Sequence, residues 1–331
     1  MPHNYLVVRL GSLGDVLLTT GVLDWWHRTE GRRFHVITRA GFADIFRNHP
    51  GVEEVLPIPP ESLTFKGWLD FCRTLKKNYS SMELIDLHGN LRTALLKSIW
   101  SARVHSYPKM GLIRRLYSRT GLAVFKNRLL NINVPQRYAQ ALSRKIPEAR
   151  ELVPRIFLEP SELENTRDLL APLGEPGRIV CLHPYATHQA KAWPEEKWKR
   201  LITIFESEGI DWIITGHDPC PLFPSSPRDF TGRTGIRQTA ALISSCQALV
   251  TGDSGPMHLA CATGTPAIGL FGPTGREWGF YPSGPDDIVL EKDLKCRPCS
   301  LHGKSAGKCL AKCMDLIQPE DVLQAVNSLR P

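Results

Sequence analysis

Polar residues follow an apolar run near the start of the chain and could carry chemistry there. The segment reads Arg9-Leu-Gly-Ser-Leu-Gly-Asp15, and the apolar residues after it recur at helical spacing. The two glycines allow a tight turn and close approach of a ligand to the backbone. Asp15 then lies in the first turn of a helix, either as a cap for free N–H groups or as a general base. The spacing Gly11-x-x-Gly14 lacks the Gly-x-Gly-x-x-Gly fingerprint of dinucleotide sites, which weighs against an NAD enzyme.

The strongest signal for a ligand is Thr251-Gly-Asp-Ser-Gly-Pro-Met-His258, which follows an apolar run and opens a helix. Pro256 suits the first turn of that helix. Free N–H groups at the helix start and the helix dipole form an anion site, to which His258 adds a donor. A second Gly-rich loop follows at 269–274, and the two loops together predict a diphosphate site. The chain has no Gly-x-x-x-x-Gly-Lys-Ser/Thr run, so a Walker-type ATPase is excluded.

Two other apolar runs end in polar residues, with weaker signals. Asp86-Leu-His-Gly-Asn-Leu-Arg92 is either turn chemistry with a solvated arginine or a site where Asn90 and Arg92 contact an acceptor. The loop at 184–194 carries Lys191 before a Trp-Pro pair that could anchor it. Lys191 is either a plain surface lysine, the commoner role, or a point charge that meets a phosphate.

A basic stretch mixes cations with apolar side chains and suits an anionic amphiphile or a membrane surface. The alternative is an ordinary solvated face. Nucleic acid is not expected as a partner, because only Tyr117 and Phe125 could stack on bases here. The stretch consists of Lys109, Arg114, Arg115, Arg119, Lys126 and Arg128, with Leu112, Ile113, Leu116 and Tyr117 between them.

The apolar pattern predicts an α/β fold that brings these segments together. Strand-like runs of Val, Ile and Leu alternate with helix-length segments, which is typical of parallel sheets covered on both faces. The expected strands are 5–10, 34–38, 52–58, 82–87, 104–107, 178–183, 212–215, 248–251 and 267–271. The expected helices are 16–29, 41–48, 66–77, 91–101, 160–171, 195–208, 238–246, 256–263 and 319–329.

A polar stretch with Pro and Gly at 147–177 separates two such halves, so we place the domain boundary there. The first domain covers 1–157 and the second 158–331, each with a Rossmann-like, doubly wound parallel sheet. Ligands of these sheets bind outside the carboxyl ends of the strands, and two domains that face each other would leave a cleft there.

Composition bounds the class of the protein. The chain has 331 residues, 42% hydrophobic and 22% charged, which is ordinary for a globular protein of two domains. Its net charge of +8 favours an acidic partner, such as nucleic acid, anionic lipid or a phosphorylated small molecule. No segment reads as a membrane span or a convincing signal peptide, so we expect a cytoplasmic protein with reduced cysteines.

Four cysteines gather near the end of the chain as Cys296-x2-Cys299 and Cys309-x3-Cys313, with His302 between the two pairs. In a reducing compartment this clustering indicates either a zinc knuckle or a Cys-bearing loop without metal. Nothing in the segment suggests an open coordination position, so any metal there would be structural.

The ordered set of segments resembles the lipopolysaccharide heptosyltransferases of glycosyltransferase family 9. These segments occur in the family's order and cover nearly the whole chain. The resemblance implies a GT-B fold of two facing Rossmann-like domains, with the C-terminal helix 319–329 packing back toward the first. The carrying segments are 9–19, 86–92, Arg137-Tyr138, Lys191-Ala-Trp-Pro194, Asp253-Ser-Gly-Pro-Met-His258, Gly272-Pro-Thr274, and Cys313 leading into Pro319-Glu-Asp-Val322.

The resemblance also implies an inverting transfer from ADP-L-glycero-D-manno-heptose to the lipopolysaccharide inner core, with no metal or other cofactor in catalysis. The Cys-rich tail looks more like the enzymes that add the second or a later heptose. A lipid A-linked acceptor and the basic stretch together predict peripheral contact with the cytoplasmic face of the inner membrane. Two rival functions stay open. A GT-B sugar-nucleotide epimerase would need no acceptor, and a non-catalytic nucleotide-sugar or lipid-binding protein would tolerate loss of Asp15.

By the same resemblance, Asp15 matches the family's proposed base, Lys191 the contact to the donor phosphates and Asp253 the contact to the donor sugar. The chain departs from the family at 215–219, where Asp218 is the nearest acid for the adenosine ribose, and in the spacing of its cysteines. The expected acceptor-binding residues are Ser12, Gly14, Asn90, Arg92, Arg114 and Arg115. The expected donor-binding residues are Thr187, Lys191, Asp218, Asp253, Thr274 and the helix start Ser254, Gly255, Pro256, Met257 and His258.

Overall fold

The computed structural model describes residues 4–303 and 312–329, and the chain divides into two compact units. The N-terminal unit contains residues 1–111 and 133–157, and the C-terminal unit contains 112–132 and 158–331. The sequence-based division puts 112–132 in the first domain, whereas the structure groups this segment with the second unit. The reason is that Tyr117 hydrogen-bonds Glu277 and Lys126 forms an ion pair with the same carboxylate.

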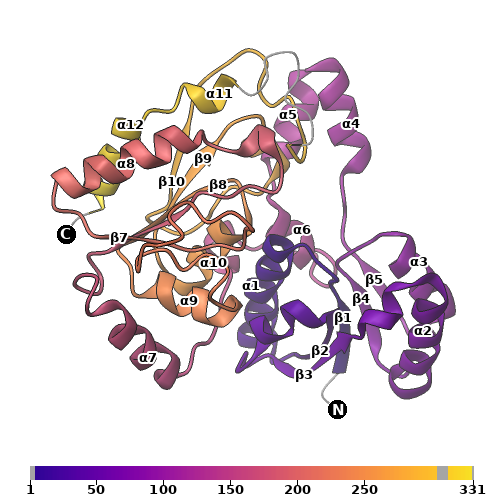
Figure 1. The fold of residues 1–331 in the computed structure, drawn as a ribbon. Helices are drawn as coiled ribbons and strands as arrows, with labels where there is room; N and C mark the ends of the chain where they lie inside the picture. The colour runs from indigo at the N-terminus through magenta and orange to yellow at the C-terminus, as the bar shows by residue number, and fades with distance from the viewer. Residues whose placement is uncertain (1–3, 304–311, 330–331) are drawn as a thin grey trace. The chain divides into compact units, whose positions relative to one another are not determined.

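Five parallel strands form the sheet of the N-terminal unit, in the order β3-β2-β1-β4-β5 (Figure 1). β1 is central, because Val8 pairs with Ile37 on one side and with Asp86 on the other. The continuous apolar run of β1 agrees with this position, since both faces of a parallel sheet are covered. The strands are β1 (Asn4–Val8), β2 (Arg33–Arg39), β3 (Val52–Ile58), β4 (Glu83–Asp86) and β5 (Val104–Ser106).

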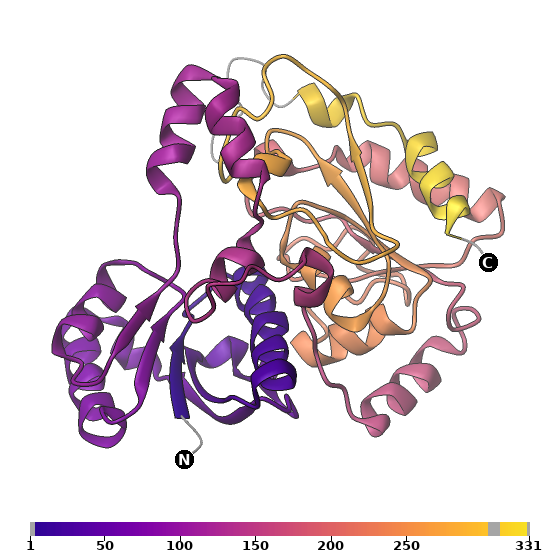
Figure 2. The ribbon, with the colours of Figure 1, turned by 180° about the vertical axis from the view of Figure 1, so that it is seen from behind.

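The long helix α1 (Leu13–Glu30) buries most of its residues and lies against the sheet of this unit (Figure 2). Its Trp26 is fully buried and packs on Phe34 of β2, with ring centroids 5.6 Å apart. Gly21 permits a close backbone approach, because a Cβ there would lie 2.3 Å from the carbonyl oxygen of Val153. The other helices of the unit are α2 (Phe65–Tyr79), α3 (Leu91–Ile99) and α6 (Val134–Ala139), with the 3-10 turns η1 (Ala40–Phe46), η2 (Pro60–Leu63) and η3 (Ala149–Leu152).

The C-terminal unit has a second sheet of five parallel strands, in the order β10-β9-β8-β6-β7. The strands are β6 (Val180–His183), β7 (Trp212–Ile214), β8 (Ala248–Gly252), β9 (Ala267–Phe271) and β10 (Ile288–Glu291). The helices are α4 (Gly111–Thr120), α5 (Ala123–Leu130), α7 (Pro160–Leu170), α8 (Glu195–Ser207), α9 (Ile236–Ser244), α10 (Gly255–Thr263), α11 (Lys312–Asp315) and α12 (Pro319–Ser328), with the 3-10 turns η4 (Gln189–Lys191) and η5 (Arg276–Trp278).

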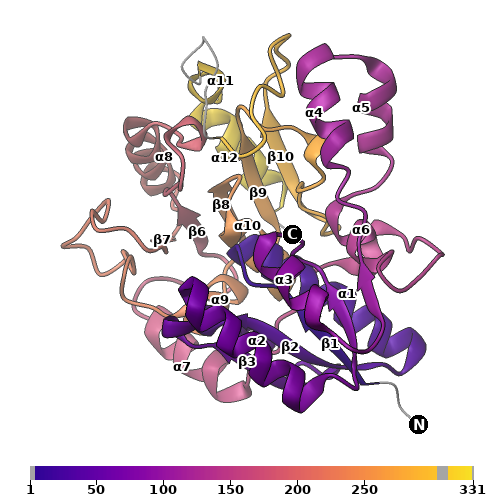
Figure 3. The same cartoon turned by 90° about the vertical axis from the view of Figure 1, so that its right-hand side faces the viewer.

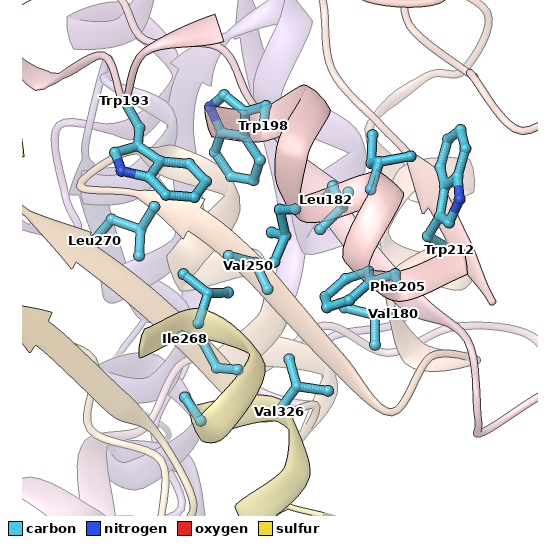
Figure 4. Close-up of a cluster of buried hydrophobic side chains, with 14 of the residues drawn as sticks. Val180, Leu182, Trp193, Trp198, Phe205, Trp212, Val250, Ile268, Leu270 and Val326 are labelled. Atoms are coloured by element: carbon cyan, nitrogen blue, oxygen red, sulfur yellow. The ribbon is translucent and has the colours of Figure 1, made fainter. Parts of the chain in front are cut away.

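The core of the C-terminal unit joins α8 and α12 to one face of the sheet (Figure 4). Trp193 and Trp198 meet edge to face, with centroids 4.8 Å apart, and Phe205 is fully buried farther along α8. Val326 of α12 belongs to the same cluster as Ile268 of β9. The helix expected at 319–329 therefore uses its apolar face inside its own unit. Its return toward the first domain stays a prediction.

All nine expected strands are present, with bounds that shift by a few residues. The edge strand β10 is an addition, and the helix expected at 41–48 is the 3-10 turn η1. Helices α4, α5 and α6 are further additions to the expected pattern. Within residues 4–303 and 312–329, no helix combines the length and the apolar character needed to cross a membrane.

Candidate active site

Strand order marks where each sheet binds ligands. In the N-terminal sheet the chain adds β2 and β3 on one side of β1, and then β4 and β5 on the other. Such a reversal is a topological switch point, and ligands of doubly wound sheets bind there, outside the carboxyl ends of the strands. The segments that follow β1 and β4 are therefore the first candidate site.

Asp15 lies in the first turn of α1, after β1, and its carboxylate has three side-chain partners. Oδ2 pairs with an Arg9 guanidinium nitrogen at 2.5 Å and accepts from the Ser12 hydroxyl at 3.1 Å, while Oδ1 accepts from the Tyr138 hydroxyl at 2.9 Å. A carboxylate can accept about four hydrogen bonds, so a ligand hydroxyl still has room to bind. The partners are side chains rather than backbone N–H groups, which argues against the capping interpretation.

The surroundings of Arg9 and Tyr138 determine the charge states of these two partners. Arg9 also donates to the Leu87 carbonyl at 2.5 Å. Burial acts to lower the pKa of Arg9, but Tyr138 and Asp15 outweigh it and the pKa is raised, so Arg9 stays cationic. Burial raises the pKa of Tyr138 well above its usual value, so its hydroxyl stays protonated and donates. A cation and a neutral donor therefore hold Asp15 in one orientation.

Tyr138 enters the sequence analysis only as part of the family resemblance, and the structure gives it a direct role at the site. It lies on α6, 123 residues from Asp15 along the chain, and its side chain is buried. Nothing in the local sequence joins these two residues. Of the expected acceptor residues, Ser12 is exposed beside Asp15, and Gly14 is buried in the first turn of α1.

Asn90 and Arg92, expected to contact an acceptor, hold local structure. The Asn90 side chain accepts from the Thr93 N–H at 3.1 Å, and the Thr93 hydroxyl accepts from the Asn90 N–H at 3.0 Å, which caps α3. Arg92 donates to the Leu63 carbonyl at 2.6 Å. Their contact with an acceptor stays a prediction.

Asp86, at the end of β4, organises the loop that follows. Its side chain is buried and accepts from the backbone N–H groups of His88 at 3.0 Å and Gly89 at 2.6 Å. Lys97 of α3 pairs with the other carboxylate oxygen at 3.0 Å. A fully bonded buried carboxylate makes this loop a fixed platform at the switch point.

His88, which the sequence analysis does not single out, lies in this loop. Its ring atom Nδ1 is buried and has no hydrogen-bond partner among the described residues. Burial, and then the positive charge of Arg9, lowers the pKa of His88 to about 4, so the ring is neutral at pH 7. Asp15 also acts on this pKa, which places both residues in one electrostatic cluster. A neutral imidazole offers one donor and one acceptor, so His88 can bind a ligand hydroxyl here.

Arg114 and Arg115 lie on α4 and belong to the C-terminal unit rather than to the unit that contains Asp15. Arg115 is exposed and Arg114 is partly buried. Both residues therefore lie at the surface of α4, and their contact with an acceptor stays a prediction.

The C-terminal sheet has its own switch point, between β6 and β8. Lys191 follows β6 and Asp253 follows β8, and Lys191 Nζ lies 2.6 Å from Asp253 Oδ2. The Thr274 hydroxyl, after β9, donates to the same oxygen at 2.7 Å. The structure thus brings together three residues that the sequence analysis assigns to the donor, from three separate strand ends.

The start of α10 is arranged for an anion. Ser254 is the N-cap of this helix, but its side chain makes no capping bond and its hydroxyl lies 3.0 Å from the Thr251 hydroxyl. The first N–H groups of α10 therefore have no side-chain cap, and Gly255 and Pro256 form the first turn. Uncapped N–H groups and the helix dipole favour a negative charge at this point.

His183 ties the end of β6 to this helix start. Its Nδ1 lies 3.1 Å from the Thr251 hydroxyl, which in turn contacts Ser254. Burial lowers the pKa of His183 to about 4, so the ring is neutral and adds no positive charge. From the sequence alone, His183 is only the last residue of a strand-like run.

Met257 and His258 lie inside the unit rather than on its surface. Met257 is fully buried, and a Cβ at Gly269 of β9 would lie 3.2 Å from its sulfur. Its side chain belongs to the core of the unit, and its expected contact with the donor stays a prediction. His258 is 4% exposed, one turn into α10.

Thr187 and Asp218 lie in the loops that follow β6 and β7. Thr187 is exposed in the loop after β6. Asp218 follows β7 and accepts from the Cys220 N–H at 2.9 Å, which forms a local turn. Their contacts with the donor stay predictions.

The expected zinc knuckle is only partly within the described residues. Cys296 is exposed, Cys299 is partly buried and Cys313 is buried, whereas Cys309 lies outside the described residues. Among residues 4–303 and 312–329, no group of His, Cys, Asp and Glu is arranged to hold a metal ion. The zinc hypothesis is therefore not tested.

Comparison with known families gives a match over most of the chain. A family model described as glycosyltransferase family 9 (heptosyltransferase) matches residues 68–310. Lipopolysaccharide heptosyltransferase 1 of Pseudomonas aeruginosa is 29% identical over 329 residues, which cover 89% of this chain and 85% of the relative. Lipooligosaccharide heptosyltransferase 2 of Haemophilus influenzae is 29% identical over 217 residues, which cover 59% of this chain and 62% of the relative.

Solved structures resemble the whole chain. A family 9 glycosyl transferase from Veillonella parvula has a TM-score of 0.80 at 20% identity, covering 99% of this chain and 98% of that one. Escherichia coli ADP-heptose LPS heptosyltransferase II has a TM-score of 0.72 at 20% identity, covering 98% of each chain. At this identity the likeness shows the fold, which is GT-B with two parallel-sheet α/β domains.

Proposed function

This chain belongs to glycosyltransferase family 9, the heptosyltransferase family, and on that premise we propose the details of its reaction. It is a glycosyltransferase that adds heptose to the lipopolysaccharide core. The proposed donor is ADP-L-glycero-D-manno-heptose, the proposed acceptor is the inner core, and the transfer inverts the anomeric configuration. The supporting observation is that each sheet carries an acid paired with a cation at its switch point, Asp15 with Arg9 and Asp253 with Lys191.

Asp15 is the proposed general base. It takes the proton from the acceptor hydroxyl as that oxygen attacks the anomeric carbon, and a single displacement inverts the configuration. Arg9 and Tyr138 hold the carboxylate while it acts, and one acceptor position is left for the substrate. A positioned base of this kind contributes roughly 10²- to 10⁴-fold to the rate.

The C-terminal cluster is the proposed site of the ADP leaving group. Negative charge grows on the diphosphate as the bond to the sugar breaks, and donors placed in advance stabilise it most. Lys191 and the start of α10 supply that positive potential, His258 adds a hydrogen-bond donor, and Asp253 binds a hydroxyl of the sugar. This scheme uses no metal, so transfer should persist in a chelator.

The acceptor position is the finer part of the proposal. The Cys-rich tail supports the second or a later heptose, although its Cys309 lies outside the described residues. The relatives reported above bear names of both kinds, heptosyltransferase 1 and heptosyltransferase 2. The acceptor is joined to lipid A, so we also propose action at the cytoplasmic face of the inner membrane.

A transfer assay with graded acceptors tests this function. Purified protein is incubated with ADP-heptose and with heptose-deficient cores of increasing truncation, with and without chelator, and product mass is read. One heptose added to one core only, in either condition, is the expected result. Tight ADP binding without transfer would move the donor sugar or the acceptor elsewhere. Folded protein with neither transfer nor ADP binding contradicts the assignment of 253–258 to the donor.

A further inference from the structure

Helices α4 and α5 form a hairpin, here named the amphipathic hairpin (111–130), and they lie side by side in Figures 1 and 3. Gly121 between them has the positive φ of 65° that ends the first helix. The hairpin is fixed to its unit near η5. The Tyr117 hydroxyl donates to Glu277 at 3.4 Å, and Lys126 pairs with Glu277 at 3.3 Å. The Tyr117 ring lies 5.9 Å from that of Trp278.

Away from this contact the hairpin exposes large apolar side chains. Leu112 is 67% exposed, Val124 66%, Leu122 53% and Leu130 41%. A single exposed Leu or Val needs no explanation. Four of them on one short hairpin are unusual, and exposed apolar side chains that gather on one element are typical of an interaction with a protein or a membrane.

The hairpin carries only positive charge. No Asp or Glu occurs anywhere between Asp86 and Glu148 in the sequence. Three of the cations form no ion pair with any residue that the structure describes, so their charge is available to a partner. The cations are Arg114, Arg115, Arg119, Lys126 and Arg128, and the three without an ion pair are Arg115, Arg119 and Arg128.

We propose that the amphipathic hairpin docks the protein on an anionic lipid leaflet. Leu112, Leu122 and Val124 enter the boundary between headgroups and acyl chains, and the arginines meet the lipid phosphates. Apolar side chains among cations on short helices are typical of segments that lie in the plane of the membrane interface. Nucleic acid would match the charge but would leave the exposed Leu and Val side chains in water. The inference rests on the proposed function in one respect, because a lipid-linked acceptor lies in such a leaflet.

Vesicle flotation tests the docking surface. The full chain is mixed with vesicles of phosphatidylethanolamine and phosphatidylglycerol, or with vesicles of phosphatidylcholine alone. Wild type should bind the anionic vesicles only, and less tightly as salt is raised. The variant Leu112→Ser/Leu122→Ser/Val124→Ser should bind roughly tenfold or more weakly, because it loses most of the apolar area that enters the lipid.

A charge variant and a matched control complete the design. Arg119→Gln/Arg128→Gln should weaken binding by about fivefold for each cation at low salt, and by less at high salt. The matched control is Leu169→Ser, which removes a leucine that is 48% exposed on α7, outside the hairpin. This variant should bind the vesicles like wild type. All the changed side chains are exposed, so melting temperatures should stay close to that of wild type.

Wild type that does not bind anionic vesicles overturns the proposal, and so does a triple apolar variant that binds them as tightly as wild type. A triple variant that loses only self-association assigns the exposed apolar side chains to contact with a second copy of the chain, and this outcome also overturns the proposal.

Transfer assays separate docking from chemistry. The triple variant should glycosylate a lipid-free core oligosaccharide at the wild-type rate and a vesicle-embedded acceptor more slowly. Wild type that binds vesicles but transfers to neither acceptor contradicts the proposed function and leaves the docking surface standing.

Discussion

The two sheets carry an ion pair at equivalent positions, but they differ in which partner is more exposed. At the N-terminal switch point the Arg9 side chain is 6% exposed and the Asp15 side chain 20%. At the C-terminal switch point the Lys191 side chain is 16% exposed and the Asp253 side chain 13%. The acid is the more accessible partner of the first pair, which suits the proposed proton transfer, whereas the two partners of the second pair are almost equally accessible.

The two acids also differ in how far along the chain the residue lies whose hydroxyl donates to each of them. Asp15 is held by Tyr138, 123 residues away, whereas Asp253 is held by Thr274, 21 residues away. The proposed base therefore depends on tertiary packing of α6 against α1. The proposed anion site depends on the ends of three strands, β6, β8 and β9, and on the start of α10.

Replacing Asp15 with Asn tests the N-terminal half of this comparison and should have the largest effect. The amide keeps the shape of the side chain but cannot take a proton. We expect turnover to fall by roughly 10²- to 10⁴-fold while ADP binds as in wild type. Product mass measures the first quantity and calorimetry the second. Equal losses in both would remove Asp15 from the role of base. Asp44→Asn, at an acid that is 63% exposed, is the control and should change neither.

Replacing Lys191 with Ala tests the C-terminal half. The loss of a charge-assisted bond to phosphate should weaken ADP binding by roughly 10- to 100-fold. Calorimetry with ADP alone measures this without an acceptor. The matched control is Lys199→Ala, which removes an exposed lysine of α8 paired with Glu195. An unchanged ADP affinity in the Lys191 variant would take this residue out of the phosphate site.

The variant Tyr138→Phe sharpens the comparison by removing only the distant support of Asp15. One hydrogen bond is lost, so turnover should fall by up to about tenfold and the free energy of unfolding by about 1 kcal/mol. Kinetics and urea unfolding measure the two effects. Tyr79→Phe, which removes a hydroxyl bond of 3.1 Å to Glu54, is the control for stability alone. Lower stability with wild-type turnover would make Tyr138 a purely structural residue.

A pH series compares the two units through the partly buried His88 and the buried His183, and it should show the smallest effect. The pKa of His88 and that of His183 are both lowered to about 4 by burial, below the value of about 6.5 in an unfolded chain. The unfolded state binds more protons between these values, so the free energy of unfolding should fall as pH decreases from about 6.5 to about 4. Each histidine contributes a slope of at most about 1.4 kcal/mol per pH unit.

Urea unfolding at several pH values checks this dependence. His88→Gln and His183→Gln should each flatten the slope below about pH 6.5 and leave it unchanged above that value. His217→Gln, at an exposed histidine, should leave the slope as in wild type. A slope that neither buried variant alters would assign the loss of stability to other groups.

The sequence predicts the strand ends well because local pattern determines them. Continuous apolar runs must be covered on both faces, so they predict parallel strands, and the polar residues after each run must lie at one edge of a sheet. Asp15, Lys191 and Asp253 are identified in this way. The half-buried edge strand β10 is missed because it has no fully buried apolar run.

Local pattern does not show whether a side chain already has a structural partner. Asn90 and Arg92 look available in the sequence, but the first caps α3 and the second bonds the Leu63 carbonyl. Met257 lies in a ligand-type loop but turns into the core. In each case the helix around the residue sets the direction of its side chain, and a list of residue types contains no direction.

By itself the sequence determines the α/β class, the strand ends that carry polar residues, and the basic and apolar composition of the hairpin. These follow from local periodicity and from the chemistry of single side chains. Only the tertiary structure decides that Tyr138 supports Asp15, that His88 is neutral beside Arg9, and that 112–132 belongs to the second unit. The physical reason is that hydrogen bonds, burial and pKa values depend on neighbours in space, and those neighbours come from distant parts of the chain.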